Sequence, residues 1–324
     1  MSAAPSSPAE VVLRCEGLGK VYRSGFFRIP YVGLEDLSLD VRRGEIFGFI
    51  GPNGAGKTTT IKCLMGLQAA TSGRAELLGK DHRDPESKRG VGFLPERPYF
   101  YEHLTAREFL HFYGSLFGLP KAVRAARIDE LLARVQLERF ADVPLRAYSK
   151  GMLQRAGVAQ ALINDPELLV LDEPMSGLDP MGRLLIRDLI FEERRRGRTV
   201  FFSSHILADV ELICDRVAIL VGGRLRGLGT VRELVGDRVK HVDIATRLPS
   251  AADAALPGEV IRRDGDAVIL RVGPDDADRA IDTLRAAGAS ILSVTPAREH
   301  LESVLLDEVQ RAAPINQKHL GVLA

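Results

Sequence analysis

An eight-residue glycine-rich motif, Gly51-Pro-Asn-Gly-Ala-Gly-Lys-Thr58, constrains the fold of this 324-residue chain more than any other segment. It matches G-x-x-x-x-G-K-[ST], the pattern of a phosphate-binding loop between a buried strand and a helix. Both neighbours are expected, because residues 45–50 form a short apolar run and residues 56–67 have a helical pattern. The backbone N–H groups of such a loop surround phosphate oxygens at the helix N-terminus.

The last two residues of this motif and a second apolar run predict nucleotide chemistry. Lys57 is expected to reach the β- and γ-phosphates, and the Thr58 hydroxyl to bind Mg²⁺. Residues 168–171 predict a buried strand that places Asp172 at its carboxyl end, where open α/β sheets bind ligands. Asp172 can hold Mg²⁺ through water, and Glu173 can orient or deprotonate an attacking water.

Composition excludes several other classes of protein. The chain has 44 Lys and Arg against 43 Asp and Glu, so its net charge of +1 indicates no general attraction to nucleic acid or anionic membrane. Its three cysteines, Cys15, Cys63 and Cys214, are widely spaced and indicate neither a disulfide framework nor a zinc site. No run approaches the ~18 apolar residues of a membrane span, and residues 1–10 lack the apolar core of a secretory signal. A reducing, cytoplasmic setting is expected.

The order of predicted elements indicates a phosphate-loop α/β protein with a mixed or parallel sheet. Strands at residues 45–50, 168–171 and 199–203 are separated by helical patterns between about residues 105 and 161. We therefore predict a disordered tail over residues 1–10, a nucleotide-binding domain over 11–235 and, within it, a helical subdomain at about 97–162.

A small α+β domain is predicted over residues 236–310, followed by a tail over 311–324. A strand at 240–245 precedes two strands that flank Asp264-Gly265, a strong hairpin signal. A helix at 275–287, a strand at 290–294 and a helix at 299–310 follow. This order resembles part of a ferredoxin-like fold and suggests a regulatory or dimerisation role.

Five motifs in order resemble those of the ATP-binding cassette (ABC) ATPases over residues 11–229. After the phosphate loop, Tyr148-Ser-Lys-Gly-Met-Leu-Gln-Arg155 resembles the family signature LSGGQ. The Asp172-Glu173 strand comes next, then Ser176-Gly-Leu-Asp179, which resembles the D-loop. His205 lies where the family has its switch histidine.

The resemblance implies an ATP-hydrolysing head-to-tail homodimer with two ATP molecules between the subunits. Ser149 and the Gly151 backbone would meet the γ-phosphate across the interface, and His205 would hydrogen-bond it. Tyr22 lies where the family stacks an aromatic ring on adenine. The catalytic residues would be Glu173, His205 and Lys57. The nucleotide-binding residues would be Tyr22, Gly51, Pro52, Asn53, Gly54, Ala55, Gly56, Lys57, Thr58, Thr59, Glu96, Ser149, Gly151 and Asp179, and the Mg²⁺ ligands Thr58, Asp172 and Glu96.

Two departures from the family pattern concern the site. The signature has Lys150 and Met152 in place of a glycine and a glutamine, and Glu96 takes the position of a loop glutamine. Leu-Pro-Glu segments like 94–96 resemble those of exporter ATPases made separately from their membrane subunits. This resemblance implies a separate multi-span permease, with the ATPase peripheral on the cytoplasmic face of the membrane. The aromatic residues 99–101 are either contacts for that permease or core of the helical subdomain.

Three other functions fit the sequence less well. A non-transport ABC ATPase that acts on ribosomes usually carries two cassettes, whereas this chain has one phosphate loop. A DNA-associated ABC ATPase needs a long coiled coil between the phosphate loop and the signature, and about ninety residues are too few. In a phosphate-loop kinase the signature, the D-loop and His205 would have no role. The basic run 194–196 is interpreted as a solvated helix end, and no nucleic-acid partner is expected.

Overall fold

The computed structural model describes residues 10–24, 29–236, 239–249 and 256–316, and divides the chain into two compact units. Unit 1 comprises residues 1–231 and 305–324, and unit 2 comprises residues 232–304. The predicted tail over 1–10 falls outside the described residues except for residue 10, as does 317–324 of the tail predicted over 311–324.

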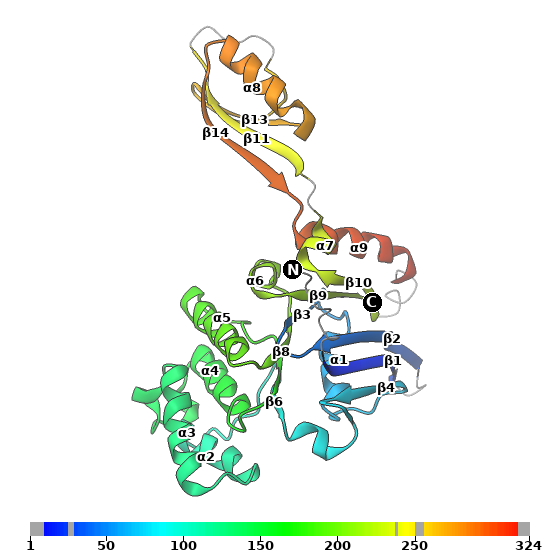
Figure 1. Cartoon of the computed structure of the whole chain (residues 1–324), viewed down its shortest axis with the longest axis vertical. Helices are drawn as coiled ribbons and strands as arrows, with labels where there is room; N and C mark the ends of the chain where they lie inside the picture. Colours follow the sequence, from blue (N-terminus) through cyan, green and yellow to red (C-terminus); the bar gives the residue numbers. More distant parts are fainter. Residues whose placement is uncertain (1–9, 25–28, 237–238, 250–255, 317–324) are drawn as a thin grey trace, which may run out of the picture. The chain divides into compact units, whose positions relative to one another are not determined.

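A six-stranded, mostly parallel sheet forms the centre of unit 1 (Figure 1). Its order is β10-β9-β3-β8-β7-β6, in which β3 lies between its parallel neighbours β9 and β8. Every residue of β3, β7 and β8 is buried, as continuous apolar runs predict for central parallel strands. The strands are β3 (Ile46–Ile50), β6 (Val91–Leu94), β7 (Leu168–Asp172), β8 (Thr199–Ser204), β9 (Arg216–Val221) and β10 (Arg224–Thr230).

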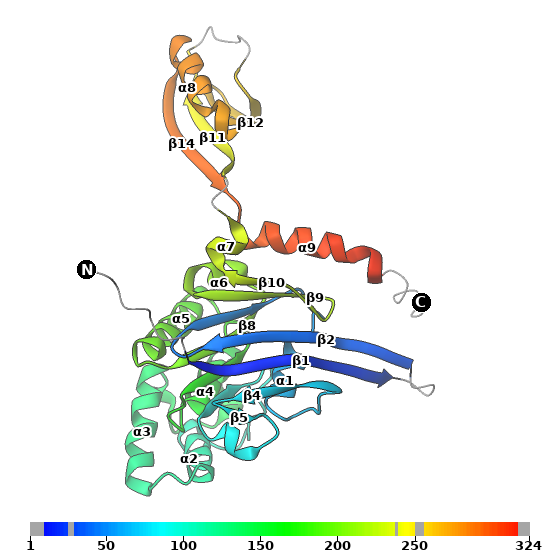
Figure 2. The ribbon, with the colours of Figure 1, turned by 45° about the vertical axis from the view of Figure 1, so that its right-hand side comes forward.

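A second, antiparallel sheet of order β2-β1-β4-β5 completes the strands of unit 1. Its strands are β1 (Val11–Ser24), β2 (Ile29–Arg42), β4 (Ser72–Leu77) and β5 (Lys80–Asp81). β1 and β2 are each 14 residues long. They pair with each other along their whole length, from Val11 with Arg42 to Ser24 with Ile29, and so form one long hairpin (Figure 2).

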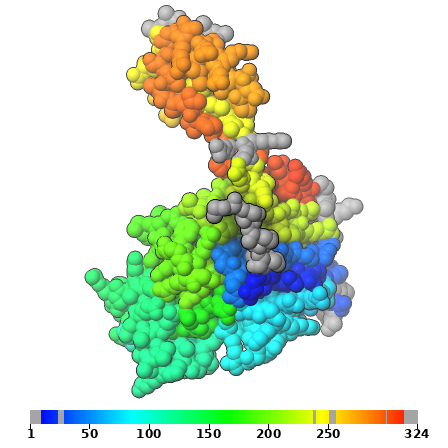
Figure 3. All heavy atoms as spheres, in the orientation of Figure 1, coloured from blue at the N-terminus to red at the C-terminus, as the bar shows by residue number. Residues whose placement is uncertain are grey.

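Helices separate the strands of unit 1 and form the predicted helical subdomain. In Figure 3 residues of this subdomain make a green flank beside the blue and cyan strands of the same unit. α2 begins with a capping box, in which Thr105 and Glu108 satisfy each other's backbone N–H groups. The helices are α1 (Lys57–Leu64), α2 (Ala106–Leu116), α3 (Lys121–Arg134), α4 (Lys150–Ala161), α5 (Pro180–Arg195) and α6 (Leu207–Ile213). A short helix, α7 (Val231–Val235), begins at residue 231 of unit 1 and continues in unit 2.

Unit 2 is a four-stranded antiparallel sheet with one packed helix. The strand order is β12-β13-β11-β14, and alternate residues of β11 and β13 pack with α8 in a separate apolar core. The predicted hairpin at Asp264-Gly265 is confirmed, because it joins the paired strands β12 and β13. The elements are β11 (Val239–Arg247), β12 (Glu259–Asp264), β13 (Ala267–Val272), α8 (Ala277–Ala286) and β14 (Ser290–Arg298).

The α/β fold with a helical subdomain and a small α+β unit is thus confirmed, and the ferredoxin-like assignment stays a prediction. The boundaries differ from those expected at 235/236 and 310/311. The last helix, α9 (Leu301–Asn316), crosses from one unit into the other, since residues 305–324 group with unit 1. Among the described residues, no helix is long and apolar enough to cross a membrane.

Truncating the chain after Val235 should leave nucleotide affinity within a few-fold of that of the full chain. All predicted nucleotide-site residues precede position 206, and unit 1 has its own apolar core. The measurement is titration with a fluorescent ATP analogue, after circular dichroism has shown that the truncated chain is folded. The full-length Lys57→Ala variant serves as the control that shows the signal expected when nucleotide binding is lost. A folded truncated chain at that baseline would contradict the autonomy of the nucleotide site.

Candidate functional site

The phosphate loop connects the buried strand β3 to α1 and lines a cleft of about 410 Å³. Gly56 has φ of +106°, and a Cβ there would lie 2.5 Å from the carbonyl oxygen of Gly33. Only glycine suits this backbone, and its close approach to β2 fixes where α1 begins. The cleft is lined by residues 52–59 together with Tyr31, Gly33, Glu96, Glu173, Ser176 and His205.

Lys57 keeps its ammonium group inside the loop. The side chain is 6% exposed, and Nζ donates a hydrogen bond to the carbonyl oxygen of Gly51 at 2.7 Å. Nζ also lies 3.5 Å from Oε1 of Glu173, so the charge has a buried counter-ion. A buried ammonium is stable only with such partners, and here they hold it among the backbone N–H groups expected to surround phosphates.

Asp172 ends β7 beneath the cleft and is almost completely buried. Ser203 on β8 donates a hydrogen bond to its Oδ1 at 2.6 Å. Burial raises the pKa of the Asp172 carboxyl, hydrogen bonds from Ser203 and Thr58 oppose this, and the charges of Glu96 and Glu173 add to it. The chain therefore holds a partly destabilised carboxylate in contact with the phosphate-loop threonine.

Glu173 projects its carboxylate into the cleft from a strained backbone. Its φ of +53° lies in the left-handed region, which costs a non-glycine residue about 1–3 kcal/mol. Its N–H donates to Oγ of Ser203 at 2.9 Å, so this one hydroxyl group orients both acidic residues. Nδ1 of His205 lies 2.7 Å from the second carboxylate oxygen of Glu173. Glu173 thus lies between Lys57 and His205. All three residues were predicted as catalytic, each from a different motif.

The donor set fits Mg²⁺ bound together with a nucleotide. Thr58 and Asp172 offer the hard oxygen ligands that this ion prefers, and Asp172 carries the charge. Within the described part of the chain no group of three or more His, Cys, Asp or Glu side chains forms a metal cage. Mg²⁺ normally completes its shell with phosphate oxygens and water, so two protein oxygens beside a phosphate loop suffice. Glu96 lines the same cleft.

Asp172→Asn should raise the melting temperature of the nucleotide-free chain by about 2–4 °C, the shift that roughly 1 kcal/mol produces in a domain of this size. Asn keeps an oxygen that can accept from Ser203 and removes a carboxylate that burial destabilises. The same variant should lose the stabilisation that Mg-ATP gives the parent chain. Scanning calorimetry with and without Mg-ATP measures both effects, and a lower melting temperature of the free variant would contradict the account.

The aromatic residue on the cleft is Tyr31, whereas Tyr22 does not line it. The Tyr22 hydroxyl lies 3.0 Å from Oγ1 of Thr59 and donates to Oε1 of Gln68 at 2.8 Å, which holds the ring behind the loop. Tyr31 is 56% exposed, and its ring centroid lies 6.1 Å from that of Tyr22. We propose that Tyr31 offers the free face for a purine base and that Tyr22 supports it. The motifs alone did not reveal Tyr31, because the length of the β1–β2 hairpin was unknown.

Tyr31→Ala should weaken ATP binding about 10-fold, because stacking a base on an aromatic side chain is worth roughly 1–3 kcal/mol. Tyr22→Phe, which removes only the hydroxyl group bonded to Thr59 and Gln68, should change affinity by less than about 3-fold. Titration with ATP and with inorganic triphosphate separates base binding from phosphate binding. Equal losses of ATP affinity for the two variants would argue against Tyr31 as the platform.

The remaining predicted site residues lie in a second cleft of about 500 Å³. Ser149 caps α4 by accepting from the N–H of Met152 at 3.2 Å, and Asp179 caps α5 by accepting from that of Gly182 at 2.8 Å. Gly151 lines this cleft as well. The N-terminus of α4, capped by the neutral Ser149, favours an anion. One chain therefore presents a phosphate loop and a signature in two different clefts.

Gln154 connects the signature helix to the catalytic strand, a link that the motifs did not predict. Its side chain is buried, and Nε2 donates to the carbonyl oxygen of Pro174 at 3.1 Å and lies 3.5 Å from that of Glu173. The only signal in the sequence was the position of this glutamine within the segment 148–155 that resembles the signature. Through this contact a shift of α4 would move the backbone of Glu173.

Comparisons with known proteins find relatives over most of this chain. The ABC transporter family model matches residues 34–176. An ABC transporter ATP-binding protein of Synechocystis is 44% identical over 311 residues, which cover 94% of this chain and 86% of that protein. The Nod factor export ATP-binding protein I of Ralstonia nicotianae is 37% identical over 71% of this chain and 71% of its own length.

Solved structures resemble a large part of this chain. An ATP-binding subunit of an ABC transporter matches with a TM-score of 0.63 and 34% identity, over 69% of this chain and 91% of that one. The cbiO1 protein of Clostridium perfringens, part of the cbiONQ ABC transporter complex, matches with a TM-score of 0.60 and 28% identity, over 69% of this chain and 90% of that one.

Proposed function

This chain belongs to the ABC transporter ATP-binding proteins and is an ATPase of that family, and we propose that it powers export through a separate membrane permease by ATP-driven dimerisation. The observation that carries the proposal is the division of the predicted site residues between two clefts. The phosphate loop, Glu173 and His205 line one cleft, and Ser149, Gly151 and Asp179 line the other. A head-to-tail pair of copies would bring the second cleft of each onto the nucleotide of its partner.

The proposed mechanism assigns each step to a group of this chain. Lys57 neutralises the β- and γ-phosphates in place of its resting contact with Glu173. The freed carboxylate of Glu173 accepts a proton from the attacking water, while His205 keeps that carboxylate oriented through the 2.7 Å contact. The water oxygen bonds to the γ-phosphorus as the bond from this phosphorus to the bridging oxygen breaks, and ADP leaves with that oxygen. Ser149 and the N-terminus of α4 stabilise the charge on the γ-phosphate of the nucleotide bound to the second copy. Mg²⁺ held by Thr58 and Asp172 would polarise the phosphate oxygens.

A groove beside the helical subdomain is the proposed contact for the permease. It measures about 580 Å³ and is lined mostly by aromatic and apolar side chains, with Glu86, Lys88 and Arg89 as its charged residues. Tyr99 is 80% exposed there, more than a core residue would be. The relatives named for Nod factor export and as part of the cbiONQ complex support a partner-coupled role. Such a partner would place the chain on the cytoplasmic face of the membrane.

Glu173→Gln should lower the rate of ATP turnover by about 100-fold or more while ATP binding persists, because it removes the proton acceptor and keeps the shape of the side chain. Lys57→Ala should instead weaken ATP binding itself, since it removes the charge that neutralises the phosphates. Steady-state hydrolysis and nucleotide titration of both variants separate the two roles. Turnover by Glu173→Gln near the parent rate would exclude this residue as the base.

Glu173→Gln with saturating Mg-ATP should form a stable dimer, because two bound nucleotides join the subunits and are not hydrolysed. Adding Ser149→Arg should abolish that dimer, since a bulky cation replaces the helix cap in the second cleft. Light scattering after size exclusion measures the mass. Arg146→Ser, on the 3₁₀ turn that precedes α4, serves as a nearby surface control. A doubly substituted chain that still dimerises would contradict the proposed role of the signature.

A further inference from the structure

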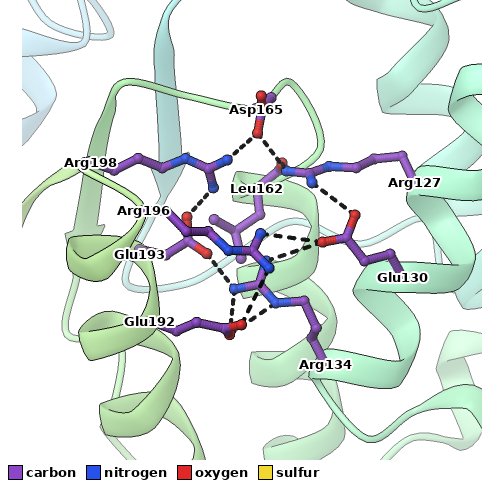
Figure 4. A network of polar contacts seen from close by, with 9 residues as sticks. All are labelled: Arg127, Glu130, Arg134, Leu162, Asp165, Glu192, Glu193, Arg196 and Arg198. Carbon is purple, nitrogen blue, oxygen red and sulfur yellow. Dashed lines mark hydrogen bonds and ion pairs between the residues drawn. The ribbon is translucent and has the colours of Figure 1, made fainter.

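An ionic cluster with the buried Glu193 at its centre joins the ends of α3 and α5 (Figure 4). Glu193, near the end of α5, is 1% exposed and accepts hydrogen bonds from Arg134 and Arg198. Arg134 is the last residue of α3 and is 11% exposed. It also donates to Oε2 of Glu192 at 2.8 Å. Both charges of the Arg134–Glu193 pair are therefore largely removed from water, and they are balanced by each other together with Arg198 and Glu192.

The same cluster holds the end of α4. Arg127 donates to the carbonyl oxygen of Leu162, the C-cap residue of α4, at 3.0 Å. It also donates to Asp165 at 3.0 Å, and Asp165 in turn pairs with Arg198 (Figure 4). The polar chain therefore runs from the end of α4 through Asp165 and Arg198 to Glu193 on α5.

The opposite ends of α4 and α5 carry the predicted signature and D-loop residues. Ser149 caps the beginning of α4, Asp179 caps the beginning of α5, and both line the second cleft. With 12 and 16 residues, these helices extend about 18 and 24 Å from the cleft to the cluster. Over such lengths a tilt of about 5° at the cluster moves a helix N-terminus by ~2 Å.

The ionic cluster is better suited to aligning the helices than to stabilising the fold. A buried ion pair adds little net stability compared with apolar residues of the same volume, because desolvation offsets the attraction. It does impose direction, since the planar guanidinium fork fixes the carboxylates that it meets. Arg134 meets Glu192 and Glu193 on adjacent positions of α5, which fixes the rotation of α5 relative to α3.

We propose that Arg134 and Glu193 are positioning residues, which hold Ser149 and Asp179 at the spacing required by a nucleotide bound to a second copy. The inference rests on the proposed composite site, in which the phosphate loop of one copy and the signature of the other bind the same nucleotide. It adds which residues set the geometry of that site. Neither side chain lines the second cleft, so both act through α4 and α5. Because a displacement of about 1 Å can cost a catalysed rate up to 100-fold, loss of the pair should lower hydrolysis without affecting the phosphate loop.

The test compares Arg134→Gln with Arg107→Gln in the full chain. Arg107 pairs with Asp129 and Asp142, all within the helical subdomain, so this control loses ion pairs that do not reach α5. Arg134→Gln should lower kcat about 10-fold or more and leave nucleotide affinity of the monomer within about 3-fold. In the Glu173→Gln background it should also raise the protein concentration needed for ATP-driven dimerisation. Arg134→Lys, which keeps the charge, should recover part of both losses.

The outcomes separate this inference from the proposed function. If the Glu173→Gln parent fails to dimerise with Mg-ATP, the composite site and the positioning role are both wrong. If the parent dimerises and Arg134→Gln behaves like Arg107→Gln in kcat and in dimerisation, only the positioning role is wrong. Thermal unfolding verifies that each chain is folded, and Glu193→Gln, of the same shape as the native residue, replaces Arg134→Gln if that variant is not. A loss of monomer affinity equal to the loss of kcat would also overturn the inference.

Discussion

The buried ammonium group of Lys57 is the interaction on which the nucleotide site depends. It is held between the carbonyl oxygen of Gly51 and the carboxylate of Glu173, and so connects the phosphate loop after β3 to the acidic end of β7. These two segments lie far apart in the sequence, and β8 separates their strands in the sheet. A charge buried in this way needs partners from both, which makes the resting site compact and ready to exchange Glu173 for phosphate.

The parallel sheet explains why the other site groups converge. β3, β7 and β8 run in the same direction, so the phosphate loop, Asp172 with Glu173, and His205 all follow the carboxyl ends of neighbouring strands. Ser203 on β8 then serves both acidic residues, and its buried hydroxyl fixes the strained backbone of Glu173. The helix ends that carry Ser149 and Asp179 lie outside this arrangement, in a cleft of their own.

The sequence was informative where function is encoded in consecutive residues. The phosphate loop, the Asp172-Glu173 strand and the Asp264-Gly265 hairpin are local patterns, and their strands and turns are found where they were expected. The sequence was uninformative where the structure depends on packing between segments that are far apart in the chain. The length of the β1–β2 hairpin, and with it the exposed ring of Tyr31, depends on cross-strand pairing. The links through Gln154 and the Arg134–Glu193 pair depend on how helices pack, which no single segment encodes.

Subunit complementation tests the central claim, that one catalytic site is built from two chains, most directly. Lys57→Ala impairs the phosphate-loop half and Ser149→Arg the signature half, so each variant alone should be nearly inactive. Mixed dimers would contain one site with both halves intact. Only a mixed pair has an intact site to hold it together, and that pair has one intact site of two, so the account predicts that an equal mixture recovers up to about half of the parent ATPase activity. A mixture no more active than its separate components would contradict it.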